Sequence, residues 1–238
     1  MRRCSALLVL SALATLLVLT LLILTPLLAD AAGASTETVA NQPYSLNAKI
    51  AARRALKKGD VAPDFALPNS QGEEVALHAL LNKGSVVIAF YRGTWCPYCN
   101  RELRALQNYL EDIQKKGATL VAISPQKPDF TLSTVEKRNL TFEVLSDVGN
   151  KIARKFKLTY RMPVVERGFF HATGHRSLEK YNGDDSYELP LPATYVVDQS
   201  GVIVYAFVNH DFRKRMPAKE LLRILDNSDF SHKHRAKN

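Results

Sequence analysis

Two cysteines three positions apart are the residues best placed to carry out chemistry in this sequence. Cys96 and Cys99 stand in the run Trp95-Cys96-Pro97-Tyr98-Cys99. On a helix this spacing puts both sulfurs on one face, within reach of a disulfide bond. A disulfide that closes so small a loop does little to constrain the unfolded chain, so the pair favours reversible redox chemistry over a structural role.

The residues around the pair predict a reactive thiol. Apolar positions recur at three- and four-residue steps from Leu103, which predicts a helix of about five turns that begins near Pro97 and ends before Gly117. Proline is favoured at the first helical position, which places Cys96 near the N-cap. The unpaired N–H groups and the positive end of the helix dipole stabilise a thiolate there and lower a cysteine pKa from its free value of about 8.5.

Two other roles for the pair stand as alternatives. Cys-x-x-Cys is also a zinc-ligand spacing, but a complete site would need His171 and His175 from a distant, loop-like segment. The pair could also be two inert core cysteines, and the order strand, tryptophan, cysteine pair, helix argues against that. We therefore expect neither a metal nor a cofactor, and we place the chemistry on Cys96 and Cys99.

Strands and helices alternate around this motif. Strands are predicted at 85–91, 119–124 and 142–145, helices at 132–138, 150–156 and 218–225, and a hairpin at 194–198 and 202–207. This alternation predicts an α/β fold with helices on both faces of a mostly parallel sheet, since a parallel crossover needs a helix to return the chain. The segment 160–191 has no clear periodicity and is interpreted as an inserted loop region.

The N-terminal segment predicts contact with a membrane. Residues 4–29 are uncharged and mostly apolar, and they follow Arg2 and Arg3. About 20 apolar residues suffice for a membrane anchor, whereas the small residues at 30–35 offer cleavage sites for a signal peptide, and both alternatives stay open. Because the two arginines should stay in the cytoplasm, either alternative exports the rest of the chain to the periplasm or the extracellular space.

Charge and domain organisation complete the prediction. The chain has a net charge of +9, but its basic residues are scattered and no nucleic-acid motif accompanies them, so we expect solvated faces and no nucleic-acid partner.

We divide the chain into a signal peptide or anchor (1–34), a spacer (35–58), an α/β domain (59–227) and a basic tail (228–238). The spacer contains a short amphipathic helix candidate at 49–58.

Four stretches resemble the alkyl hydroperoxide reductase and thiol-specific antioxidant family, which includes the peroxiredoxins. They lie at 59–67, 90–99, 145–147 and 191–198, and the resemblance covers residues 58–226. It implies a thioredoxin-like fold with a central mixed β-sheet flanked by helices. It also implies a thiol-dependent antioxidant enzyme that reduces hydroperoxides and is regenerated by an external dithiol such as thioredoxin.

The resemblance also places the cysteines in the family's motif Pro-x-x-x-Thr-x-x-Cys. With the strand ends aligned, Cys99 takes the position of the peroxidatic cysteine, Arg92 stands at the family's proline and Cys96 at its threonine. Pro192 stands where typical peroxiredoxins carry an activating arginine and thioredoxins carry a cis-proline. In the thioredoxin comparison, Pro192 packs against the cysteine pair and, together with Trp95, shapes the surface for an extended substrate.

Three mechanistic interpretations remain open. In a peroxidase, Cys99 attacks the O–O bond, becomes a sulfenic acid and is resolved by Cys96 to a disulfide. In an exported thiol–disulfide oxidoreductase, Cys96 attacks a protein disulfide and Cys99 releases the product. A membrane-tethered binding module without turnover is the third. Helix-end electrostatics favour Cys96 as the nucleophile and the family alignment favours Cys99; the peroxidase is the main interpretation.

Overall fold

The structure, a computed structural model, describes residues 46–172 and 178–227. These residues belong to one compact unit that begins at Tyr44. The predicted signal peptide or anchor (1–34) and the predicted basic tail (228–238) lie outside the described residues. Among the helices that are described, none is long and apolar enough to cross a membrane.

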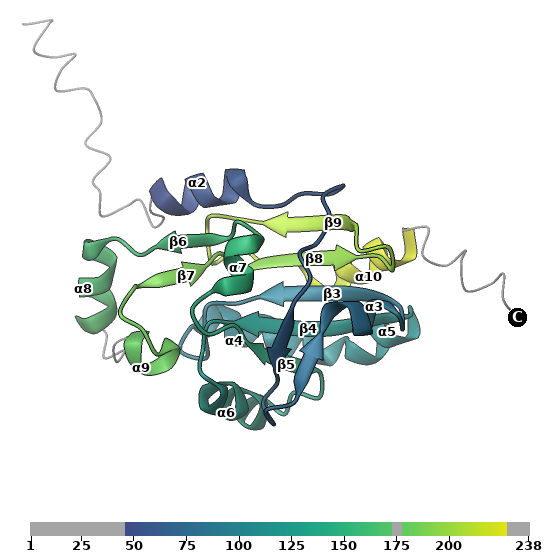
Figure 1. The fold of residues 1–238 in the computed structure, drawn as a ribbon, viewed down its shortest axis with the longest axis horizontal. Helices are drawn as coiled ribbons and strands as arrows, with labels where there is room; N and C mark the ends of the chain where they lie inside the picture. The colour runs from purple at the N-terminus through teal and green to yellow at the C-terminus, as the bar shows by residue number, and fades with distance from the viewer. Residues whose placement is uncertain (1–45, 173–177, 228–238) are drawn as a thin grey trace, which may run out of the picture. The chain divides into compact units, whose positions relative to one another are not determined.

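A five-stranded mixed sheet forms the centre of the described chain (Figure 1). Its order is β5 (Glu143–Ser146), β4 (Ala118–Ser124), β3 (Ser85–Phe90), β8 (Ala193–Val197) and β9 (Ile203–Val208). β3 and β5 run parallel to β4, while β8 runs antiparallel to both β3 and β9. The mixed sheet, its three leading strands and the C-terminal hairpin are confirmed.

Central strand β3 divides the interior into two clusters because its side chains alternate between the faces of the sheet. Val86, Ile88 and Phe90 enter one cluster, and Val87 and Ala89 enter the other. The first cluster is covered by α2 (Leu46–Arg54), α3 (Leu77–Leu81) and α7 (Lys151–Lys155), and the second by α4 (Pro97–Asn108), α5 (Leu110–Lys115) and α10 (Ala218–Asn227). The sheet is therefore flanked by helices on both faces, as predicted.

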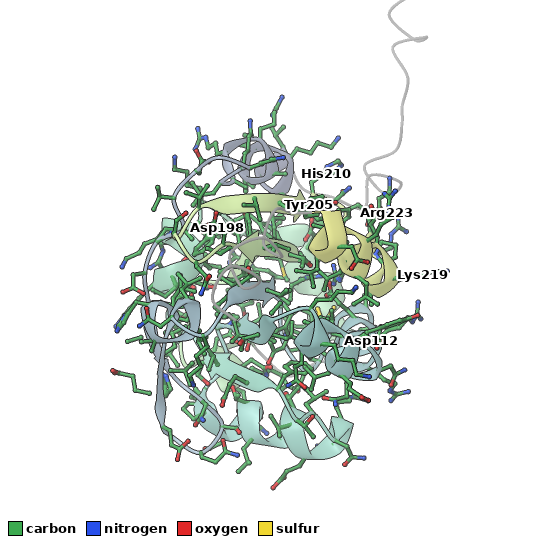
Figure 2. All side chains as sticks on the ribbon, turned by 90° about the vertical axis from the view of Figure 1, so that its right-hand side faces the viewer. Asp112, Asp198, Tyr205, His210, Lys219 and Arg223 are labelled. Atoms are coloured by element: carbon green, nitrogen blue, oxygen red, sulfur yellow. The ribbon has the colours of Figure 1, made fainter. Side chains whose placement is uncertain are left out.

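On the second face, α10 lies beside edge strand β9. Figure 2 shows Arg223 of α10 near Tyr205 of β9, and the charge of Arg223 acts on the Tyr205 hydroxyl. Tyr205 packs partly against the second cluster, where Leu221 and Leu225 of α10 are buried. The closing helix predicted at 218–225 is thus confirmed, and it covers the face of the sheet that also carries α4.

The predicted five-turn helix is two helices. α4 ends at Asn108 and α5 begins at Leu110, with Tyr109 between them at φ −107° and ψ 8°. The Tyr109 N–H donates to the Leu106 carbonyl (3.2 Å), and the Tyr109 carbonyl accepts from the Ile113 N–H (2.9 Å). Leu106, Leu110 and Ile113 all face the second cluster. The apolar period therefore continues across the break, which is why the sequence did not reveal it.

The prediction of a loop region at 160–191 was wrong. It contains β6 (Thr159–Arg161), α8 (Val164–Ala172), α9 (Leu178–Asn182) and β7 (Glu188–Pro190), and β6 pairs antiparallel with β7. These are short elements, and short elements show too few repeats for a period to be recognised. α6 (Pro128–Arg138) and α7 agree with the helices predicted at 132–138 and 150–156.

The amphipathic helix predicted at 49–58 forms earlier, as α2. Ala48, Ala51 and Ala55 are buried in the first cluster, and the Leu56 N–H donates to the Phe156 carbonyl (3.2 Å). Residues 46–56 of the range assigned to a spacer therefore pack onto the α/β fold. Farther along, β1 (Ala66–Pro68) and β2 (Glu74–Ala76) form a separate antiparallel pair.

Candidate active site

A loop at the end of β3 carries the cysteine pair and depends on a glycine. Gly93 has φ +146°, a conformation that L side chains rarely adopt. A Cβ at this position would lie 2.6 Å from Nε1 of Trp95. The absence of a side chain at Gly93 therefore lets the Trp95 ring pack against the Gly93 backbone, just ahead of Cys96 in the chain.

Three hydrogen bonds hold this loop. The Thr94 N–H donates to Oε1 of buried Gln126 (2.7 Å), and Nδ2 of Asn100 donates to the Thr94 carbonyl (2.8 Å). The Cys96 N–H donates to the Gly93 carbonyl (3.1 Å). Because these partners come from the loop after β4 and from α4, the cysteines are fixed relative to both elements.

The structure brings Cys96 and Cys99 together at the start of α4. Cys96 is the N-cap residue and Pro97 the first helical residue, so the predicted start of the helix is confirmed. Both cysteines are free thiols, and they are almost fully buried, at 1% and 0% exposure. Burial by the fold and proximity to each other make the pair a dithiol that can close to a disulfide.

The two sulfurs are electrostatically unequal. A hydrogen bond from the Cys99 side chain lowers the pKa of Cys96 to about 6, with further contributions from the charges of Arg92 and Arg215 and from the Cys99 N–H, against burial. Burial and the neighbouring Cys96 raise the pKa of Cys99. The surroundings of the pair therefore favour ionisation of Cys96 and disfavour ionisation of Cys99.

A buried arginine–glutamate contact lies beside the second sulfur. Nη2 of Arg215 lies 3.3 Å from Sγ of Cys99, and its Nε lies 2.8 Å from Oε2 of Glu102. Burial raises the pKa of Glu102 to about 8, although Arg215 pulls it down. Neither residue was predicted from the sequence. Glu102 stands three positions after Cys99 on the same helical face, which is a usable signal, whereas Arg215 comes from the distant segment before α10.

A cavity of about 300 Å³ opens beside Arg215 and Glu102. α4 forms one wall and the segment before α10 forms the other. Its lining includes Tyr98, Ala105, Leu106, Met216 and Pro217 together with Arg101, Arg213, Arg215 and Glu102. Arg215 thus joins the cavity wall to the cysteine pair.

Arg92 follows β3 by two residues and was left out of the predicted site. It is 5% exposed, and its Cζ lies 4.9 Å from the Trp95 ring centroid and 4.3 Å from that of Phe212. Such distances are typical of cation–π contacts. The arginine that replaces the family's proline is therefore a buried cation at the redox pair.

Pro192 lies at the end of β3 where the cysteine loop begins. It is buried and directly precedes Ala193, which pairs with Phe90. The peptide bond before it is trans, since the described residues contain no cis peptide bond. Pro192 thus occupies the expected position in the fold without the isomer found in thioredoxins, and its role in the site stays a prediction.

The zinc alternative finds no support in the described residues, where no group of three His, Cys, Asp or Glu side chains is placed to hold a metal. His171 lies on α8 with Nε2 3.1 Å from the Tyr187 hydroxyl. His175 lies outside the described residues.

The pKa of Cys96 gives a direct prediction. Because only the thiolate reacts with iodoacetamide, the alkylation rate of Cys96 should rise as the pH passes about 6 and level off well below the pKa of a free cysteine. The measurement is the pH profile of alkylation, with Cys96 identified by peptide mass spectrometry. Cys99, whose pKa is raised, should be alkylated only at higher pH. The reverse order would refute the assigned thiolate.

Comparisons with known proteins agree with this arrangement. The AhpC/TSA family model matches residues 58–206, so the chain belongs to the AhpC/TSA family. The chloroplastic peroxiredoxin Q of Gentiana triflora is 27% identical over 186 residues, which cover 78% of this chain and 74% of that protein. The peroxiredoxin Bcp of Escherichia coli strain K12 is 33% identical over 101 residues, which cover 42% of this chain and 64% of that protein.

Solved structures support the fold. The peroxidoxin BcpB from Mycobacterium tuberculosis superimposes with a TM-score of 0.56 at 22% identity, covering 72% of this chain and 97% of that one. The Plasmodium vivax 2-Cys peroxiredoxin in its reduced state gives 0.55 at 21% identity, covering 77% of this chain and 100% of that one. The described domain therefore has the thioredoxin-like fold of the peroxiredoxins.

Proposed function

We propose that this chain reduces hydroperoxides by attack of the Cys96 thiolate, with Cys99 as the resolving cysteine. The family and the peroxiredoxin relatives make the chain a thiol-dependent peroxidase, and thioredoxin-like dithiols are the reductants of such enzymes. The observation that supports the assignment of the cysteines is their unequal environment, because the thiolate is the nucleophile and Cys96 is the sulfur whose ionisation the structure favours. This assignment reverses the one implied by the motif alignment.

In the first step the Cys96 sulfur attacks one oxygen of the hydroperoxide. An S–O bond forms, the O–O bond breaks, and the departing alkoxide takes a proton from solvent and leaves as an alcohol. Cys96 is oxidised to a sulfenic acid while the hydroperoxide is reduced by two electrons.

The second step uses Cys99. The negative Cys96 sulfur is one cause of the raised pKa of Cys99, and sulfenic acid formation removes that charge. Arg215, 3.3 Å from Sγ of Cys99, then stabilises the Cys99 thiolate. Its attack on Cys96 forms the S–S bond and releases hydroxide, which is protonated to water. An external dithiol such as thioredoxin returns the pair to the reduced form.

Three neighbouring residues are proposed to support the site. Pro97 begins α4 and thereby directs the N-terminus of the helix at Cys96. Trp95 lies between Gly93 and Arg92 and walls off the pair. Pro192 fixes the backbone at the end of β3.

The location of the chain is a proposal from its first residues. We propose export of the domain (59–227), with residues 4–29 as a cleaved signal or a membrane anchor, residues 35–58 as a connection whose second half packs onto the fold as α2, and 228–238 as a basic tail. Some relatives are named as chloroplastic proteins, and those names do not support export of this chain. Export is tested with a membrane-impermeant thiol reagent applied to cells whose cytoplasmic membrane is intact. We expect the reagent to label the protein if the domain lies outside the cytoplasmic membrane.

The proposed function is tested by mixing the reduced full-length protein with hydrogen peroxide or tert-butyl hydroperoxide in a stopped-flow instrument. We expect peroxide consumption at least about 10²-fold faster than with a free thiol, as preorganised charge stabilisation typically gives. Formation of a Cys96–Cys99 disulfide should accompany it. The control is the double variant Cys96→Ser/Cys99→Ser. A rate equal to that of a free thiol, together with rapid reduction of insulin disulfides, would favour the disulfide oxidoreductase instead.

A further inference from the structure

Arg92 is a buried cation with unused hydrogen-bonding capacity beside the reactive sulfur. Its side chain is 95% buried, and its Nε has no hydrogen-bond partner within the described residues. A buried donor without a partner costs free energy, and a buried charge costs more. An arginine kept in this state is expected to meet its partner when a ligand arrives.

Two aromatic rings fix the position of the guanidinium. The Cζ of Arg92 lies 4.3 Å from the Phe212 centroid and 4.9 Å from the Trp95 centroid. Contacts through the faces of the rings leave the N–H groups of the cation unused. Arg92 is thus held in place by groups that cannot accept a hydrogen bond in the guanidinium plane.

The surroundings of Arg92 connect it to the chemistry. Its charge acts on both sulfurs, and the other groups whose charges act on it are Tyr160 and Glu166. Cys96 is the sulfur whose ionisation it favours. A hydroperoxide that reaches the Cys96 thiolate therefore enters the field of a preorganised cation whose Nε–H has no partner.

We propose that Arg92 binds the hydroperoxide oxygens and stabilises the negative charge that develops on the departing oxygen as Cys96 attacks. The inference rests on the proposed function, and it makes Arg92 a catalytic residue for an O–O substrate. Arginine stays protonated throughout, so it donates hydrogen bonds while the proton that completes the alcohol comes from solvent. A fixed, charged donor is most effective where charge develops in a water-poor site.

The test separates contact with peroxide from an effect on the thiolate. Arg92→Met and Arg92→Lys are compared with Arg104→Met, an exposed arginine of α4, in the full-length protein. Each is reacted with hydrogen peroxide and with iodoacetamide at a pH two units above the measured pKa of Cys96 in that variant, so that the sulfur is fully ionised. Iodoacetamide has no departing oxygen and serves as the reference for the nucleophilicity of the sulfur.

We expect Arg92→Met to slow the peroxide reaction by about 10²–10³-fold, the loss typical of removing one such donor, while alkylation changes less than about threefold. Arg92→Lys keeps the charge without the planar donors and should fall between Arg92→Met and wild type. Arg104→Met should match wild type with both reagents. Circular dichroism and the urea unfolding midpoint confirm that each variant is folded, and Arg92→Lys provides the comparison if the methionine variant is unfolded.

Two outcomes would overturn the inference in distinguishable ways. If both reagents slow by the same factor, or peroxide does not slow at all, Arg92 does not contact the substrate although the peroxidase stands. If wild type reacts with peroxide no faster than a free thiol, the proposed function fails and the role of Arg92 fails with it.

Discussion

Cys96→Ser is expected to abolish hydroperoxide reduction, whereas Cys99→Ser is expected to keep the first step and lose turnover. Without the Cys96 thiolate, the remaining Cys99 is a buried thiol whose pKa is raised, so little nucleophile exists at neutral pH. We expect the peroxide rate of Cys96→Ser to fall by about 10³-fold or more, since loss of a nucleophile removes the reaction pathway itself.

Cys99→Ser keeps the attacking sulfur and loses its resolving partner. The serine hydroxyl can replace the hydrogen bond that lowers the pKa of Cys96, so one equivalent of peroxide should still be consumed at a rate within about tenfold of wild type. The sulfenic acid should then accumulate on Cys96, where dimedone trapping and peptide mass spectrometry detect it. Sulfenic acid on Cys99 of the Cys96→Ser variant would restore the assignment given by the motif alignment.

Phe156→Ala is expected to destabilise the fold by about 3–5 kcal/mol, the usual cost of removing a buried phenylalanine. The Phe156 ring is fully buried, with its centroid 5.0 Å from that of Phe90 and 5.2 Å from that of Tyr195. Phe90 is the last residue of β3, directly before the cysteine loop. The cavity should therefore also loosen the end of the strand that positions the redox pair.

Urea denaturation of the reduced protein measures this loss as a fall in the unfolding midpoint at unchanged slope. Phe130→Ala is the matched control, because the Phe130 ring lies against Tyr181, with centroids 4.8 Å apart and planes tilted by 58°, but is only partly buried on α6. It should cost about 1 kcal/mol. Equal losses of unfolding free energy for the two variants would mean that the contacts of Phe156 with Phe90 and Tyr195 contribute no more stability than a partly buried aromatic pair.

The sequence predicted the elements whose signal is local. Continuous apolar runs identified β3 and β4, and proline beside the cysteines located the start of α4. The short elements at 159–190 escaped because three- to nine-residue segments carry too little periodicity, and the break at Tyr109 escaped because both helices bury the same face. Local patterns therefore predicted the layers of the fold and missed its short connections.

The site divides in the same way. Cys96, Cys99, Trp95 and Pro97 are adjacent in the sequence, so their spacing was informative. Arg215 contacts Cys99 across a separation of 116 positions in the sequence. Several arginines lie in the same basic segment, and the sequence does not indicate which of them points into the protein. The burial of Arg92 likewise depends on Phe212, which comes from the segment after β9. Contacts of this kind require the tertiary structure.

Trp95 gives the redox pair an intrinsic optical reporter. It is the only tryptophan in the chain, it directly precedes Cys96, and it contacts both core clusters and the cation of Arg92. All indole fluorescence of the protein therefore originates beside the two sulfurs. Since a disulfide quenches a neighbouring indole, the emission of unlabelled protein can follow the oxidised fraction in real time and, in defined dithiol buffers, give the reduction potential of the pair.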